Sequence, residues 1–188
     1  MRVLGVDPGF GRTGVAVVDG APGRMALIHA TCLETVPQTS EPRRLLQLFD
    51  LVISTVRTVA PDVAAVEQLF FSTNKRTAMR VSEARGVVLC GLAQSGVTVV
   101  EYTPTQVKEA VCGYGAARKQ QVARMTARLL GLESLQGSDD VADACAVAVC
   151  HHHRARLGAR LAQRDTDQRS SLDAAVASAR ARLLRSAL

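Results

Sequence analysis

Four acidic residues carry the strongest chemical signal in this chain of 188 residues: Asp7, Glu67, Asp140 and Asp143. Each lies at the end of an apolar stretch or within one, where a folded element would deliver it to one end of a sheet. Carboxylates that a fold gathers repel one another, so such a cluster usually binds a cation or has raised pKa values. Ligand sets made only of oxygen favour Mg²⁺ or Mn²⁺ over zinc. The sequence therefore indicates metal-assisted phosphate chemistry.

Two of these acids end predicted strands. Asp7 closes the run RVLGVD and enters a loop whose glycines let the backbone approach a ligand closely. An ordinary Asp between a strand and a turn would give the same pattern. Glu67 ends VAAV, and a charge beside a buried strand is costly unless it reaches water, a partner or a metal. A Glu that only marks the exit of the strand to the surface is the alternative.

The other two acids, Asp140 and Asp143, are three residues apart, so a helix places both on one side. Acids here could simply complement the positive end of the helix, which accounts well for Asp139. It accounts poorly for Asp143, which lies a turn deeper among alanines. We predict that Asp139 caps the helix and that the Asp140/Asp143 pair is functional.

Two strand-end acids and a helix-borne pair can together hold two divalent ions about 3.5–4 Å apart. One ion would help to form hydroxide from water, and the other would stabilise the leaving oxygen of an in-line displacement. Lys119 or Lys108 would then stabilise the charge that develops on the phosphate.

The elements that must position these residues follow from periodicity and turn residues. The predicted strands cover residues 2–7, 13–19, 25–34, 63–66 and 97–101. The predicted helices cover residues 41–60, 75–92, 105–111, 118–130 and 138–153, the last capped by Ser138. Short connections favour an antiparallel meander first, and the later alternation favours parallel strands. We therefore predict an α/β fold with a mixed sheet, three antiparallel strands then two parallel strands, flanked by helices. Ligands in such sheets favour the carboxyl ends of the strands.

Composition and charge limit the alternatives. Hydrophobic residues make up 47% of the chain and charged residues 21%, as in ordinary globular proteins. The apolar runs are too short to cross a membrane, which takes about 20 residues, and the N-terminus does not read as a signal peptide. Five cysteines without a CxxC pair indicate buried, reduced thiols, so we expect a cytoplasmic protein with no membrane partner. Three consecutive histidines, residues 151–153, point in different directions on a helix, which predicts a solvated helix end rather than a metal site.

The net charge of +6 is concentrated at the C-terminus. Residues 151–188 hold eight Arg and three Asp, which leaves a net +1 for residues 1–150. A basic tail on a nearly neutral body suits a polyanionic partner, although a solubilising tail has the same composition. We predict a domain over residues 1–153 and a basic tail over 154–188 that is partly helical or disordered.

Several segments, in order, resemble the RuvC-type Holliday junction resolvases of bacteria, over about residues 1–153. They are GVDPGFGRTG at 5–14, EQLFF at 67–71, SEARG at 82–86, TPTQVKEAVCGYGAARK at 103–119 and DVADA at 140–144. The resemblance implies a ribonuclease H-like fold and a homodimer with one active site per subunit. It also implies paired symmetric nicks in four-way DNA junctions, in homologous recombination and DNA repair. Partnership with a RuvA/RuvB branch-migration complex is a further implication.

The resemblance also assigns roles to residues. The four acids become the catalytic and metal-binding residues, with two Mg²⁺ per subunit for which Mn²⁺ can substitute. Lys119 and Lys108 match basic residues near the active site. Phe70 matches an aromatic wedge or stacking group at the junction centre, although Phe70 or Phe71 could instead be the ring that packs in the core.

A basic stretch after this aromatic pair offers further DNA contacts. The candidates are Lys75, Arg76, Arg80 and Arg85, since Arg76 and Arg80 share a helical face. An ordinary solvated helix face would have the same composition.

Three other functions fit parts of the pattern. An actin-like or sugar-kinase-like ATPase also begins with a strand, an Asp and a Gly-containing loop, but usually needs a second domain. A non-catalytic binder of branched DNA would not need all four acids. A related ribonuclease H-like nuclease acting on RNA is the third alternative.

Overall fold

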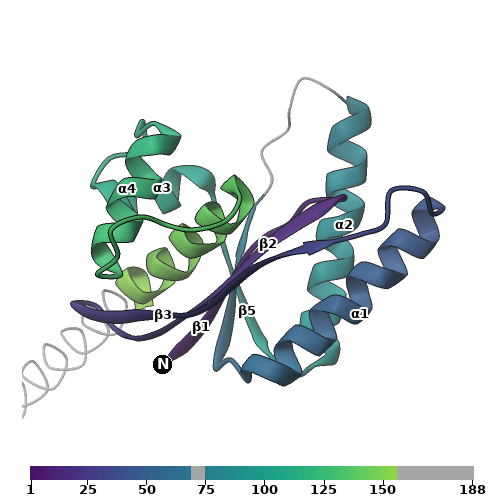
Figure 1. Ribbon diagram of the computed structural model, residues 1–188, viewed down its shortest axis with the longest axis horizontal. Coiled ribbons are helices and arrows are strands. Elements are labelled where there is room, and N and C mark those ends of the chain that lie inside the picture. The colour runs from purple at the N-terminus through teal and green to yellow at the C-terminus, as the bar shows by residue number, and fades with distance from the viewer. Residues whose placement is uncertain (69–74, 156–188) are drawn as a thin grey trace, which may run out of the picture. The chain divides into compact units, whose positions relative to one another are not determined.

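A mixed five-stranded sheet forms the centre of the fold, in the strand order β3-β2-β1-β4-β5 (Figure 1). The strands are β1 (Arg2–Asp7), β2 (Arg12–Ala21), β3 (Arg24–Glu34), β4 (Val63–Glu67) and β5 (Thr98–Tyr102). β1 pairs antiparallel with β2 and β2 with β3, whereas β1–β4 and β4–β5 are parallel. This computed structural model describes residues 1–68 and 75–155. The predicted α/β fold, three antiparallel strands followed by two parallel strands, is confirmed.

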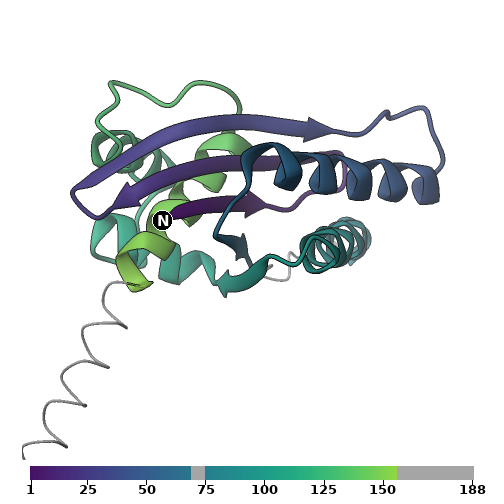
Figure 2. The same cartoon turned by 90° about the horizontal axis from the view of Figure 1, so that it is seen from below.

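Helices cover both faces of the sheet. They are α1 (Glu41–Val59), α2 (Lys75–Gln94), α3 (Pro104–Cys112), α4 (Lys119–Leu129) and a further helix over residues 139–155. α1 and α2 pack on one face, and α3, α4 and the 139–155 helix pack on the other (Figures 1 and 2). The predicted helices are all present, with bounds shifted by at most two residues.

Two separate apolar cores explain why β1 and β4 read as continuously apolar. In β1, Val3 belongs to the core beneath the 139–155 helix, whereas Leu4 and Val6 belong to the core beneath α1 and α2. β4 follows the same alternation, because Ala65 faces the first core and Val66 faces the second. Successive side chains of a strand point to opposite faces, so a strand covered on both faces needs apolar residues throughout.

The histidines at residues 151–153 are not a solvated helix end, and that prediction is wrong. His151 and His152 are buried, and burial lowers the pKa of both imidazoles. Nδ1 of His151 lies 2.9 Å from the hydroxyl of Tyr102, and Nε2 of His152 donates to the carbonyl of Val18 at 3.1 Å. The helix packs along the sheet as far as these residues, so each ring meets a buried oxygen instead of water.

The cysteines also differ from expectation in part. All five are free thiols in the described part of the chain, and Cys145 and Cys150 are buried as predicted, but Cys90 is exposed. Burial raises the pKa of the Cys145 thiol to about 12, so this residue stays protonated. No helix in the described ranges is both long enough and apolar enough to cross a membrane.

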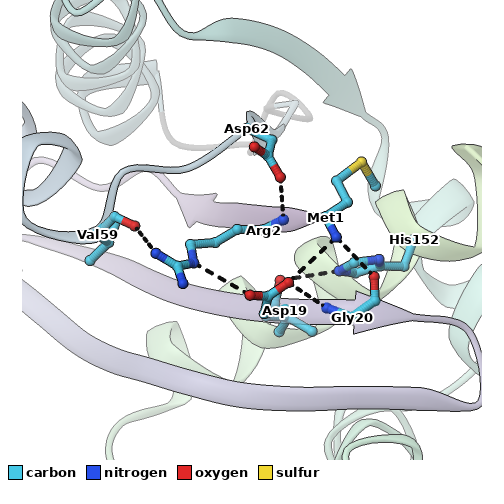
Figure 3. Close-up of polar contacts among 8 residues, drawn as sticks. Met1, Arg2, Asp19, Gly20, Val59, Asp62 and His152 are labelled. Atoms are coloured by element: carbon cyan, nitrogen blue, oxygen red, sulfur yellow. Dashed lines mark hydrogen bonds and ion pairs between the residues drawn. The ribbon is translucent and has the colours of Figure 1, made fainter.

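A polar network ties down the amino end of β1 (Figure 3). The α-ammonium of Met1 lies 3.4 Å from Oδ1 of Asp19, and Nε of Arg2 lies 3.5 Å from Oδ2 of the same carboxylate. The backbone N–H of Arg2 donates to Asp62 at 2.7 Å, and its guanidinium donates to the carbonyl of Val59 at 3.0 Å. These contacts join β1 to β2 and to the connection between α1 and β4. They lie at the end of β1 opposite Asp7.

Candidate active site

Strand alternation places Asp7 and Glu67 on the same face of the sheet. In the parallel pair β1–β4, Gly5 lies opposite Ala65, and both face the core beneath the 139–155 helix. Asp7 and Glu67 come two residues later on their strands and therefore point to that face. Their carboxyl groups share a hydrogen bond at the carboxyl edge of the sheet.

Two glycines allow the 139–155 helix to reach this edge. A Cβ on Gly5 would lie 2.1 Å from the carbonyl oxygen of Ala144, and a Cβ on Gly14 would lie 1.9 Å from that of Asp140. Gly14 is paired with Asp7 across β1 and β2. The missing side chains thus leave room for the helix backbone directly on the sheet. That close approach brings Asp140 and Asp143 to the side of Asp7.

The electrostatics show that the four acids act on one another. The pKa of Asp7 is raised to about 8, first by burial and then by the negative charges of Glu67, Asp143 and Asp140. Burial also raises the pKa of Glu67, and Asp143 adds to that effect. The hydrogen bond from Asp7 and the charges of two lysines partly offset the shift of Glu67. The metal-free protein therefore keeps a proton between Asp7 and Glu67 near neutral pH.

Lys119 and Lys108 line a small pocket beside these acids. Its volume is about 210 Å³, and its other lining residues are Glu67, Pro104, Val107, Val122, Asp143 and Ala146. Nζ of Lys119 lies 2.8 Å from Oδ2 of Asp143 and 3.5 Å from Oδ2 of Asp139. Burial alone would lower the pKa of Lys119, but the hydrogen bond and the charges of these two acids outweigh it and raise the pKa. Lys119 is therefore a cation at neutral pH and cannot act as a general base.

Arg12 is a residue that the sequence analysis missed. Its Nε lies 3.2 Å from Oδ2 of Asp140 and 3.7 Å from Oε1 of Glu34. Strand alternation could have identified it. Arg12 and Gly14 are two residues apart on β2, so both point towards the 139–155 helix. Ser138 also contacts Asp140, with its hydroxyl 3.4 Å from the same Oδ2.

The donor set suits a hard divalent cation. All four acids offer oxygen, and a cation would take the place of the proton between Asp7 and Glu67 and offset their repulsion. Within residues 1–68 and 75–155, no three Asp, Glu, His or Cys side chains are already arranged around one point. Asp143 and Asp140 are instead paired with Lys119 and Arg12. The residues fit a metal site, and a bound cation would compete with Lys119 and Arg12 for these carboxylates.

The predicted DNA contacts are only partly described. Phe70 lies outside the described residues, as does Phe71. Lys75 and Arg76 begin α2, but their side chains are not among those that the structure describes.

Two other arginines of α2 have protein partners. Arg80 pairs with Glu41 and lies 5.6 Å from the centre of the Phe10 ring, over which Arg44 also stacks. Arg85, which we predicted to contact a phosphate, instead forms a partly buried ion pair with Glu101.

The shared proton predicts how the stability of the metal-free protein depends on pH. The pKa of Asp7 rises from an ordinary 3.8 to about 8 on folding, so the folded state holds a proton that the unfolded state has lost. Stability in EDTA should therefore fall as pH rises from about 6.5 to 8, by about 1–2 kcal/mol. The lowered pKa values of His151 and His152 act mainly below this window.

Thermal unfolding measured at several pH values, in EDTA and in Mg²⁺, checks this prediction. A divalent ion should replace the proton and reduce the decline, and Asp7→Asn should also reduce it, because Glu67 remains buried. A midpoint in EDTA that does not change between pH 6.5 and 8 would contradict the shared proton.

Comparison with known proteins places this geometry in context. Residues 3–151 match the family described as "Crossover junction endodeoxyribonuclease RuvC". The protein of that name from Syntrophomonas wolfei is 44% identical over 161 residues, which cover 86% of this chain and 94% of the relative. The one from Chloroflexus aggregans is 46% identical over 155 residues, covering 82% and 94%.

Two solved structures resemble the fold. Thermus thermophilus RuvC, in a complex described as "with Holliday junction substrate", has a TM-score of 0.79 and 35% identity, with 84% of this chain and 96% of that chain covered. The yeast mitochondrial Holliday junction resolvase Ydc2 has a TM-score of 0.59 and covers 81% of this chain and 79% of its own, at 13% identity. The second likeness concerns the fold alone.

Proposed function

This chain belongs to the RuvC family of crossover junction endodeoxyribonucleases, and we propose that Asp7, Glu67, Asp140 and Asp143 are its catalytic acids. As a member of that family it is a nuclease that resolves Holliday junctions, and it depends on a divalent metal. The substrate is four-way junction DNA, and the reaction hydrolyses phosphodiester bonds. The ATPase and RNA-nuclease alternatives have no support in this family membership.

The single observation that supports the catalytic assignment is the convergence of acids from β1, β4 and the 139–155 helix at one edge of the sheet, where the pKa of Asp7 is raised. Burial raises this pKa most, and the charges of Glu67, Asp143 and Asp140 add to it, so acids from three elements act on one site. A surface carboxylate at the end of a strand would not show it. The cluster lies at the carboxyl edge of the sheet, where ligands of such sheets bind.

We propose that the four acids hold two Mg²⁺ ions per subunit and that Mn²⁺ can substitute. Divalent ions held by these acids would activate a water molecule and stabilise the charge on the attacking and leaving oxygens. The chain's own residues prepare that chemistry. Asp7 and Glu67 release their shared proton and become fully anionic ligands. Lys119, held as a cation in the pocket between Glu67 and Asp143, stabilises negative charge that develops on the phosphate.

A cleavage assay tests the function directly. A synthetic four-way junction and a linear duplex of the same sequence are incubated with the protein, with and without Mg²⁺. We expect paired nicks in the junction only, and only with Mg²⁺. Equal cleavage of the linear duplex, or cleavage in EDTA, would contradict the proposal.

Replacing Lys119 with Ala should lower turnover more than junction affinity. The ammonium lies 2.8 Å from Asp143 and lines the pocket that holds Glu67, so its charge acts on the reacting phosphate. Loss of one such cation is expected to reduce single-turnover cleavage about 10–100-fold. Junction affinity should change by less than about threefold, since most phosphate contacts remain. An unchanged cleavage rate would remove Lys119 from the chemical step.

The remaining assignments are proposals about assembly. Paired symmetric nicks need two active sites, so we propose a homodimer with one site per subunit. Phe70 is proposed to stack at the junction centre, and Lys75, Arg76, Arg80 and Lys108 to contact phosphates. We further propose a nuclease domain over residues 1–153 followed by a basic tail over 154–188. A RuvA/RuvB partner complex and a cytoplasmic location complete the proposal.

A further inference from the structure

Arg12 lies between a proposed catalytic acid and the solvent. It begins β2, and its side chain is 52% exposed, whereas the side chain of Asp140 is 34% exposed. The loop that leads to it is closed by Thr13, whose hydroxyl donates to the carbonyl of Gly9 at 2.9 Å and accepts from the N–H of Gly9 at 3.3 Å. These contacts restrain the loop backbone next to Arg12.

The position of Arg12 conflicts with metal binding at Asp140. Nε of Arg12 and the hydroxyl of Ser138 both lie against Oδ2 of Asp140, one of the two carboxylate oxygens that could ligate a metal. A guanidinium and a divalent cation repel each other, and both are attracted to the same carboxylate charge. Metal binding at Asp140 therefore weakens its pairing with Arg12.

The Glu34 carboxylate does not hold Arg12 strongly. Glu34 lies 3.7 Å away and is 66% exposed, and exposed ion pairs of this kind contribute little to stability. The pKa of Arg12 is raised, first by a hydrogen bond with the Cys32 side chain and then by the charge of Asp140, so the guanidinium stays charged throughout. A planar guanidinium that loses a carboxylate has the geometry to bind a phosphate instead.

We propose that Arg12 exchanges partners: it pairs with Asp140 in the metal-free protein and with a DNA phosphate once a divalent ion binds Asp140. This inference rests on the proposed function, because it needs both the metal site and the junction. The exchange couples metal binding to DNA binding. A metal ion at Asp140 frees the Arg12 guanidinium for the DNA backbone. The metal and the DNA therefore strengthen each other's binding.

Junction affinity in EDTA and in Ca²⁺, measured with the full chain, tests the exchange. Ca²⁺ is a hard cation that carboxylates bind, and intact junction on a denaturing gel verifies that no cleavage has occurred. For Arg12→Gln we expect a change in Kd of less than about twofold in EDTA and a loss of about fivefold in Ca²⁺. The slope of log Kd against log salt should decrease by about 1 in Ca²⁺ only, as expected for one lost phosphate contact.

Asp140→Asn tests the same exchange without altering Arg12. This substitution frees the guanidinium even in EDTA, so the junction should bind more tightly than to the wild type. The gain should shrink by at least about half in the Arg12→Gln/Asp140→Asn double variant, since the two changes share one interaction. Glu34→Gln is the matched control for the loss of a carboxylate beside Arg12, and it should leave the Ca²⁺ dependence unchanged.

Each result decides one question. An equal loss for Arg12→Gln in EDTA and in Ca²⁺ would overturn the exchange and make Arg12 a constant phosphate contact. No loss in either condition, or a gain in Asp140→Asn that does not depend on Arg12, would overturn it as well. If the wild-type protein neither cleaves junctions in Mg²⁺ nor binds them, the proposed function fails instead.

Discussion

Replacing Asp7 with Asn is expected to reduce junction cleavage by about 10³-fold or more while junction binding survives. Asp7 lies at the centre of the acidic cluster, where the charges of the other three acids all raise its pKa. An amide keeps the shape of the side chain but removes the charge that would hold a divalent ion. Loss of one member of a catalytic set commonly costs rate factors of this size. Single-turnover cleavage at saturating protein, beside a binding assay in EDTA, separates the two effects.

The same substitution should not destabilise the metal-free protein. Asp7 holds a proton near neutral pH, so Asn replaces a neutral side chain with another neutral one. Thermal unfolding in EDTA at pH 7.5 should show equal or higher stability for Asp7→Asn. A clear loss of stability would mean that a folding defect contributes to the lost activity.

Glu67→Gln, Asp140→Asn and Asp143→Asn should also abolish cleavage. Asp139→Asn is the matched control, because Asp139 is on the same helix but its side chain is 86% exposed. We expect its cleavage rate to stay within about threefold of the wild type. Normal turnover by Asp143→Asn would contradict the assignment of the helix-borne pair.

Replacing Gly14 with Ala should damage both the fold and the site. The new Cβ would lie 1.9 Å from the carbonyl oxygen of Asp140, so the 139–155 helix must move away from β2. Overpacking of this kind typically costs about 1–3 kcal/mol of stability. The movement also displaces Asp140 and Asp143, and a misplacement of about 1 Å can cost about 10²-fold in rate. Urea unfolding and single-turnover cleavage measure the two effects.

Gly86→Ala is the matched control for this substitution. Gly86 lies in the middle of α2, and a Cβ there would meet no atom within 4 Å. Alanine should be neutral or stabilise the helix by up to about 1 kcal/mol. Wild-type stability and cleavage in Gly14→Ala would mean that the helix does not depend on close contact with the sheet.

Much of this protein follows from local patterns in its sequence. The apolar runs of β1 and β4 predict strands that are covered on both faces, and each run ends in an acid. The alternation of side chains is a property of any strand and relates the residues within each run, but the register of β1 with β4 decides that Asp7 and Glu67 share a face. The spacing of Asp140 and Asp143 likewise follows from the period of a helix.

Contacts between distant segments could not be predicted in this way. The run of histidines predicted a solvated helix end at His151, and nothing near it in the sequence places the hydroxyl of Tyr102 beside that ring. Nor did any local pattern indicate that the 139–155 helix packs its backbone directly against Gly5 and Gly14. Both depend on how closely that helix packs against the sheet.

The sequence by itself therefore determined the order of the strands and helices, the fold class and the four acids. Only the tertiary structure decided their partners: a shared proton for Asp7 and Glu67, Lys119 for Asp143 and Arg12 for Asp140. The physical reason is range. Periodicity and turn residues act over a few neighbours along the chain, whereas ion pairs and pKa shifts depend on distances through space between residues on different strands and helices.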